Sequence, residues 1–296
     1  MRPRRWRTST AKPEVALDLV AVGEVLLDVT APGLAAGSVV HGPVRVRAGG
    51  VPVHAAVAAA EAGGRAAVVG RVGSDPAAAA IRDALGRAGV TAWLQEDPAL
   101  PSGTFVEARD AIVADRGASA ALAVTDIPSP LAAGAVLVSG HALLHDDTVA
   151  AARHALTSAR AGFAAVVAAS ARLIESLGPG TFHERAAGAT VLVANADESH
   201  ALTGLEPAAA AAELALRYRV ACVTAGACGA FAAAGSEVVQ VGVDRVAGAT
   251  TGAGDALAGV LLLSLVRGLG LRAAVESACA AASVALRSGH PAASGG

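Results

Sequence analysis

The residues best suited to chemistry stand near the C-terminal end, where the sequence reads Thr-Thr-Gly-Ala-Gly-Asp at positions 250–255. This small turn leads directly into residues 256–266, an apolar stretch with the length and composition of a buried helix. Amide groups in the first turn of a helix lack partners within it and carry the positive end of the helix dipole, so they favour an anion. Gly252 and Gly254 would let the main chain approach a phosphate closely.

Asp255 is the unusual member of this segment. A carboxylate beside a phosphate site is electrostatically unfavourable unless it has a role, such as accepting a proton from an attacking hydroxyl. The combination of an anion site and a neighbouring base suits phosphoryl transfer to an alcohol. A simpler alternative stays open, because any helix favours an acidic residue in its first turn.

Other ways of binding phosphate or activating a substrate are excluded by residue content. The only lysine is Lys12, in the N-terminal tail. A Walker A loop and a protein kinase each need a lysine at the phosphates, and Schiff-base chemistry needs one in the core. No G-x-G-x-x-G follows a candidate strand, which argues against a nicotinamide oxidoreductase.

Composition narrows the class of protein further. Hydrophobic residues make up 54% of the 296 residues but aromatic residues only 2%, so a stable core requires many helices and strands. A net charge of −2 argues against a nucleic-acid partner and against an anionic-membrane partner. No apolar run reaches the roughly 20 residues that a membrane span needs. Three cysteines without C-x-x-C spacing fit a cytoplasmic protein. Residues 1–13 are expected to be a disordered basic tail.

The remainder, 14–296, is predicted to be one domain in which apolar β-branched runs alternate with alanine-rich helical stretches. This alternation indicates an α/β fold with a doubly wound, mostly parallel sheet flanked by helices. The expected strands are 17–22, 66–72, 136–139, 164–168, 190–194 and 220–224, and the expected helices are 53–62, 76–88, 148–161, 198–202, 207–217, 254–266 and 271–288.

Two segments depart from this rhythm, residues 25–47 and 92–125, which contain more proline, glycine and charge. We expect both to leave the sheet edge and to form a small β-strand lid. In open α/β sheets the ligand lies beyond the carboxyl ends of the strands, where such a lid would exclude water from the reaction. The alternative is that both are surface loops.

Two further motifs follow predicted strands, and each has two interpretations. Asn195 and Glu198 could hold a hydrated Mg²⁺, or Asn195 could simply cap a helix with Glu198 completing the capping box. The run Thr224-x-Gly226-x-x-Gly229 could receive a nucleotide, or could form a tight turn into the next strand.

The order of these motifs along the chain resembles the PfkB (ribokinase-like) carbohydrate kinase family, over essentially the whole sequence after the tail. The Thr-Gly-Ala-Gly-Asp element at 251–255 is the most specific part of the likeness. The other parts are Gly-Glu at 23–24 with Asp28, Gly-Gly at 49–50 with the helix after it, residues 69–75, Asn195-x-x-Glu198 and Thr224-x-Gly226-x-x-Gly229.

The resemblance implies an ATP-dependent kinase that phosphorylates a hydroxymethyl group of a small sugar or sugar-like substrate, using ATP and Mg²⁺. It implies that Asp255 is the catalytic base and that the amides of Gly252, Ala253 and Gly254 form the anion hole for the transferred phosphoryl group. It implies that Thr224, Gly226 and Gly229 bind the nucleotide. It implies that Asn195 and Glu198 organise Mg²⁺ and the phosphates through water. The substrate-binding residues that it implies are Asp28, Gly49, Gly50 and His54.

This chain departs from the family's pattern at positions that bear on substrate and activation. His54 stands where the family usually has asparagine; it could contact a hydroxyl or an acidic substrate, or be structural. Ala249 replaces an aspartate that helps hold a monovalent cation in relatives, which argues against potassium activation. A second hypothesis is therefore a sugar- or nucleoside-binding protein of the same fold with weak or lost catalysis. The partner we expect besides the substrate is a second copy, paired through strand edges of the lid.

Overall fold

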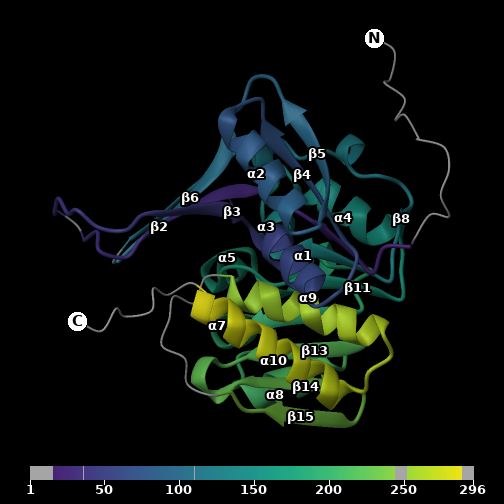
Figure 1. The fold of residues 1–296 in the computed structure, drawn as a ribbon. Helices are drawn as coiled ribbons and strands as arrows, with labels where there is room; N and C mark the ends of the chain where they lie inside the picture. The colour runs from purple at the N-terminus through teal and green to yellow at the C-terminus, as the bar shows by residue number, and fades with distance from the viewer. Residues whose placement is uncertain (1–15, 36, 110, 244–251, 289–296) are drawn as a thin grey trace.

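The computed structural model describes residues 16–35, 37–109, 111–243 and 252–288 (Figure 1). The predicted tail at 1–13, Ala249 and the two threonines at 250–251 lie outside these ranges.

A nine-stranded sheet forms the centre of the molecule, in the order β15-β14-β13-β12-β11-β9-β1-β4-β5. The strands from β13 to β5 run parallel, whereas β14 and β15 are antiparallel additions at one edge. The predicted class, a doubly wound and mostly parallel sheet flanked by helices, is confirmed. The strands are β1 (Leu19–Val22), β4 (Ala66–Gly73), β5 (Thr91–Asp97), β9 (Ala135–Ser139), β11 (Phe163–Val167), β12 (Val191–Asn195), β13 (Val220–Thr224), β14 (Ala230–Ala234) and β15 (Glu237–Val241).

Helices cover both faces of this sheet. Leu19 and Ala21 of β1 pack on the face covered by α1, α2, α9 and α10, whereas Val20 and Val22 pack on the face covered by α3 to α8. The central strands are apolar throughout because both faces are buried. Among the helices in the described ranges, none combines the length and apolar character needed to cross a membrane. The helices are α1 (Val51–Glu61), α2 (Pro76–Arg87), α3 (Gly140–Leu144), α4 (Val149–Ser158), α5 (Ala171–Leu177), α6 (Pro179–Arg185), α7 (Ala196–Thr203), α8 (Pro207–Leu214), α9 (Ala253–Val266) and α10 (Leu271–Ser288).

A separate four-stranded sheet, which we call the lid, projects from the body (Figure 1). Its order is β3-β2-β6-β7, with β2 antiparallel to β3 and parallel to β6. Its strands come from the two segments that were expected to leave the central sheet. They are β2 (Leu26–Ala31), β3 (Arg45–Gly49), β6 (Ser102–Ala108) and β7 (Ile112–Gly117).

The prediction is wrong for one part of the second lid segment. Residues 92–97 belong to β5, which pairs in parallel with β4 at the edge of the central sheet. An edge strand has one neighbour and exposes much of its surface, so it keeps polar side chains such as Gln95 and Glu96 and lacks the apolar signature of its neighbours. The short pair β8 (Leu131–Ala132) and β10 (Ala159–Arg160) completes the strands of the described residues.

Candidate active site

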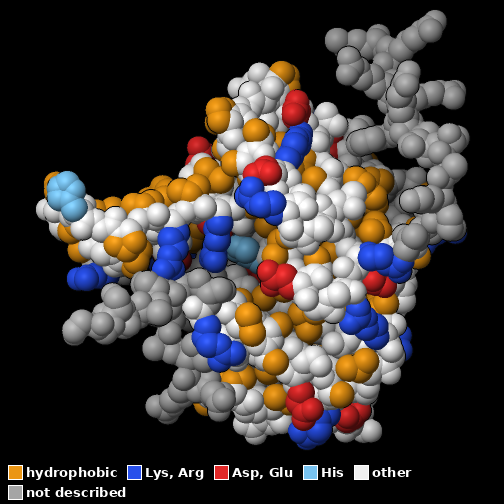
Figure 2. Space-filling model, in the orientation of Figure 1, with side chains coloured by type: hydrophobic (Ala, Val, Ile, Leu, Met, Phe, Trp, Pro, Cys, Tyr) orange, Lys and Arg blue, Asp and Glu red, His pale blue; other side chains and the backbone are white. Residues whose placement is uncertain are grey.

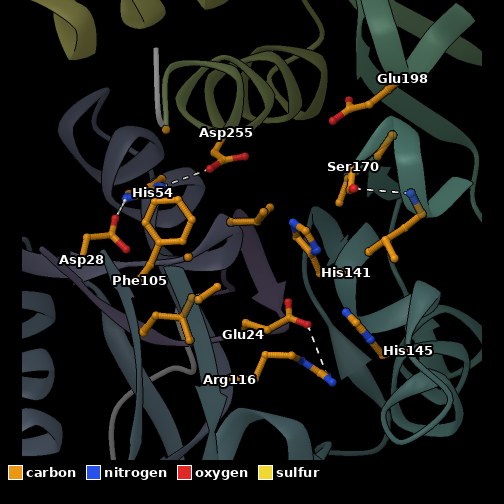
Figure 3. Close-up of a pocket in the computed structure, with 18 residues that line it drawn as sticks. Glu24, Asp28, His54, Phe105, Arg116, His141, His145, Ser170, Glu198 and Asp255 are labelled. Atoms are coloured by element: carbon orange, nitrogen blue, oxygen red, sulfur yellow. Dashed lines mark hydrogen bonds and ion pairs between the residues drawn. The ribbon is translucent and has the colours of Figure 1, made fainter. Parts of the chain in front are cut away.

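A cavity of about 560 Å³ opens where the lid meets the carboxyl ends of the central strands. Its walls come from the strands of the lid, the start of α1, the segments after β9 and β11, α7 and the beginning of α9. Figure 3 shows Asp28, His54 and Asp255 along one side of this space, with Glu24 and Arg116 below and Glu198 opposite. The predicted residues that line it are Asp28, Gly50, His54, Glu198, Gly252 and Asp255.

The start of α9 brings the predicted base to this cavity. Gly252 has φ 85, a left-handed conformation that suits glycine, and the helix begins at Ala253. Asp255 lies in the first turn, where its side chain is 17% exposed, and the helix then buries every residue from Ala256 to Ser264. The amides of Ala253 and Gly254, which have no acceptor within the helix, therefore lie in the same turn as a carboxylate that lines the cavity.

His54 connects Asp255 to Asp28. One ring nitrogen, Nδ1, is hydrogen-bonded to Asp255 Oδ2 at 3.0 Å. The other, Nε2, lies 3.0 Å from Asp28 Oδ2, an ion pair without the alignment of a good hydrogen bond. Burial lowers the pKa of His54, but the hydrogen bonds and charges of Asp255 and Asp28 outweigh it and raise the pKa to about 9. The two carboxylates therefore favour the protonated form of the ring.

Glycines allow the elements around this histidine to approach closely. A Cβ at Gly49 would overlap the carboxylate of Asp28, and one at Gly50, where φ is 95, would overlap the carbonyl oxygen of Glu24. A Cβ at Gly252 would lie only 2.9 Å from His54 Nδ1. Replacing any of these glycines would thus displace a residue of the cavity wall.

Glu24 and Arg116 form a polar pair deeper in the cavity. The hydroxyl of Ser139 donates to Glu24 Oε2 at 2.8 Å, and the other oxygen, Oε1, lies 3.7 Å from Arg116 Nη2. The guanidinium is held by two hydrogen bonds to Asp147 and one to Thr148. Glu24 Oε1 and Arg116 Nε are both buried, with no hydrogen-bond partner among the residues that the structure describes.

Asn195 and Glu198 form the capping box of α7. Of the two roles considered for them, helix capping and Mg²⁺ binding, this is the structural one. The amide of Glu198 donates to Asn195 Oδ1, and the amide of Asn195 donates to Glu198 Oε2, each at 2.8 Å. Burial raises the pKa of Glu198 to about 7, and the negative charge of Asp255 adds to the rise. Glu198 still lines the cavity, so capping does not remove it from the site.

The run from Thr224 to Gly229 takes the turn conformation. It contains a short 3₁₀ helix, Gly226–Cys228, and leads into β14. Gly229 has φ 82, and a Cβ there would overlap the carbonyl oxygen of Val241. Thr224 and Asn195 are register partners at the carboxyl ends of β13 and β12, but neither they nor Gly226 and Gly229 line the cavity.

Several cavity residues were not singled out as site residues from the sequence. His141 and His145 follow β9, so the rule that ligands lie beyond strand ends could have identified them. Phe105 and Arg116 come from lid strands that carry no such signal. Ser170, with φ 53, is the only non-glycine residue of positive φ in the described chain, and it follows β11.

The fold and site together define an α/β protein whose ligand cavity lies between a lid and the carboxyl edge of a parallel sheet, with an acid at a helix start facing it. The sequence matches the pfkB family of carbohydrate kinases over residues 16–294. The chain belongs to this family and is a kinase.

Solved structures share the fold at low sequence identity. Adenosine kinase from Sinorhizobium meliloti is 22% identical, with a TM-score of 0.82 over 92% of this chain and 94% of that one. An E. coli protein proposed to be a ribokinase II, in complex with ATP and Mg²⁺, is 18% identical, with a TM-score of 0.80 over 91% and 92%. Fructokinase from Vibrio cholerae O395, bound to fructose, ADP and calcium, is 24% identical, with a TM-score of 0.75 over 90% and 91%. Comparison with curated protein sequences gave no match.

Proposed function

We propose that this kinase transfers the γ-phosphoryl group of ATP to a hydroxymethyl group of a small sugar or sugar-like molecule, with Asp255 as the base. The observation that carries the proposal is the position of Asp255: this residue lines the cavity from the first turn of a buried helix. A base and an anion site then lie within one helical turn of each other, as in-line phosphoryl transfer requires.

The chemistry follows from this arrangement. The substrate hydroxyl donates its hydrogen bond to Asp255, and its oxygen attacks the γ-phosphorus. The new O–P bond forms as the bond from that phosphorus to the bridging oxygen of ADP breaks, and the hydroxyl proton passes to Asp255. The amides of Gly252, Ala253 and Gly254 stabilise the charge on the equatorial oxygens, so positioning and electrostatics provide most of the rate.

On the nucleotide side, we propose that Thr224, Gly226 and Gly229 contact ATP and that Asn195 and Glu198 organise Mg²⁺ through water. Glu198 fits this role because burial, with the negative charge of Asp255, raises its pKa, and a bound cation would favour its ionised form. Within the described ranges, no three His, Cys, Asp or Glu side chains cluster into a metal cage. This suits Mg²⁺, which usually keeps several waters and takes phosphate oxygens with one or two carboxylates. When bound, Mg²⁺ offsets negative charge on the phosphates.

On the acceptor side, we propose that Asp28, Gly49, Gly50 and His54 shape the sugar subsite. Glu24 Oε1 and Arg116 Nε, which make no hydrogen bond to the described residues, add an acceptor and a donor at the wall of the same cavity. Relatives of this fold are described as kinases of adenosine, aminoimidazole riboside and fructose, so the acceptors to test include both nucleosides and ketoses.

The function is tested by measuring ADP release with Mg²⁺ and ATP against a panel of sugars, sugar acids and nucleosides, with and without potassium. Thermal-shift measurements with the same compounds run in parallel. We expect at least one acceptor to stimulate ADP release, with little effect of potassium. Stabilisation by a sugar without ADP release would instead identify a binding protein on a kinase fold.

We further propose that two copies pair through the lid. Its outer strands β3 and β7 are sheet edges, and valine and isoleucine side chains are exposed on and beside them (Figure 2). Val46 is 59% exposed and Val113 is 65% exposed. Exposed edges of this kind favour pairing with another strand. Light scattering at micromolar concentration should give the mass of a dimer, and a monomeric mass would reject the proposal.

A further inference from the structure

His54 occupies an unusual position for a residue expected to bind substrate, because carboxylates face both of its ring nitrogens. Asp28 on β2 lies 3.0 Å from Nε2, and Asp255 on α9 lies 3.0 Å from Nδ1. The side chain is 14% exposed, and its ring packs against Gly252. A substrate hydroxyl would therefore have to compete with a carboxylate at either nitrogen.

This geometry favours a proton on each nitrogen. A neutral imidazole has one N–H and one lone pair, and that lone pair would face carboxylate oxygens, which only accept hydrogen bonds when ionised. The two carboxylates that contact the ring, Asp28 and Asp255, favour a cation. Arg47 on β3 lies 3.9 Å from the same Asp28 oxygen and opposes it, but its side chain is 44% exposed and therefore screened by solvent. The raised pKa of about 9 agrees with this arrangement.

We propose that His54 is a positioning residue of the phosphoryl-transfer site, a cation that joins Asp28 to Asp255 and fixes the orientation of the base. Its bond to Asp255 Oδ2 leaves Oδ1 as the oxygen that receives the substrate proton. Figure 3 shows that second oxygen directed away from His54, toward the open part of the cavity. The positive charge of His54 offsets the repulsion between the carboxylates of Asp28 and Asp255, which would otherwise face each other. The part of this inference that concerns turnover rests on the proposed function.

The kinetic constants of a His54 variant distinguish a positioning residue from a substrate contact. If His54 bound the acceptor, replacing it would chiefly raise the KM for the acceptor. As a positioning residue it should mainly affect kcat, because a freed Asp255 spends less time aligned with the attacking hydroxyl. The pH dependence also differs: the wild-type enzyme should lose kcat as pH rises through about 9, when the ring loses its proton.

The first test is spectroscopic and needs no substrate. The ring nitrogen and carbon resonances of the eight histidines are followed by NMR from pH 6 to 10, and those of His54 are identified by their absence in His54→Asn. We expect the shifts of a doubly protonated ring at pH 7.5 and a titration midpoint near 9. A neutral His54 ring at pH 7.5 would overturn the inference.

The second test is kinetic, with the best acceptor from the panel. We expect His54→Asn to lower kcat on the order of 10- to 100-fold, with little change in the KM for ATP and without the fall above pH 9. His154→Asn, on α4 outside the cavity, is the matched control and should keep the wild-type profile. Equal pH profiles for wild type and His54→Asn would overturn the positioning role. If wild type turns over no acceptor, the proposed function fails, while the NMR titration still decides whether His54 is the bridging cation.

Discussion

The packing of α1 against α9 can be tested with a single methyl group at Gly259. This glycine is buried in α9 at its contact with Ala55 of α1. A Cβ at position 259 would lie 2.7 Å from the Ala55 carbonyl carbon and 2.9 Å from its Cα, and closer still to the carbonyl oxygen. These are main-chain atoms, so no side-chain rotation can relieve the overlap.

The expected magnitude follows from this geometry. Ordinary van der Waals contact begins at about 3.4 Å, so Gly259→Ala must separate the helices by about 1 Å. Overpacking costs about 1–3 kcal/mol, and because this overlap is with main-chain atoms we take the upper part of that range, about 2–3 kcal/mol, which the higher helix propensity of alanine offsets by about 1 kcal/mol. We expect the free energy of unfolding to fall by about 1–2 kcal/mol. Because α1 carries His54 and α9 carries Asp255, kcat should also fall, on the order of 100-fold for a 1 Å displacement.

The assay is urea-induced unfolding followed by circular dichroism, with Gly86→Ala as the matched control. Gly86 lies in α2 and is exposed, and no atom of the described part of the chain lies within 4 Å of the position that a Cβ would take. There the same substitution should raise the free energy of unfolding by about 0.5–1 kcal/mol, because only helix propensity changes. A fall in the free energy of unfolding for Gly259→Ala together with a rise for Gly86→Ala would support close packing of α1 against α9. A Gly259→Ala protein as stable as wild type would refute it.

Three further predictions concern capping, pH and magnesium. Asp75→Ala should lower the free energy of unfolding in urea by about 1–2 kcal/mol, because this N-cap of α2 accepts hydrogen bonds from Ala78 N, Ser102 N and Ser102 Oγ. Its exposed neighbour Ser74 is the control, and Ser74→Ala should change the free energy of unfolding little. The folded-state pKa of His54 is raised from 6.5 to about 9, so its contribution to the free energy of unfolding is full below pH 6.5 and is lost as pH rises through 9. The free energy of unfolding of His54→Asn, measured in urea, should therefore depend less on pH between 6.5 and 9 than that of wild type. Glu198→Gln should raise the Mg²⁺ concentration for half-maximal ADP release about tenfold, whereas the exposed neighbour Asp197→Asn should not.

The sequence predicted those strands that are buried on both faces, because continuous apolar runs such as β12 and β13 have few alternative structures. It failed at β5, where an edge position allows polar residues. It also missed α3, α5 and α6, which have five to seven residues each and so show little of the helical period.

The site was predictable where chemistry and local motif coincide. Gly252 and Asp255 share one helix start, so local sequence singled them out, whereas Asp28 and His54 were expected at the site from the family resemblance; all four line the cavity. The bridge that His54 makes was not predictable, because it joins residues 26 and 201 positions away along the chain. Glu24 and Arg116 meet only after the lid has formed, which no local pattern records.

The most direct test of the account compares wild type with Asp255→Asn. ADP release with the best acceptor measures turnover, and thermal shift with Mg²⁺ and ATP measures nucleotide binding. Loss of the base should lower kcat by about 100-fold or more, while stabilisation by ATP stays close to that of wild type. Near-normal turnover in Asp255→Asn would remove Asp255 from the mechanism and contradict the central claim.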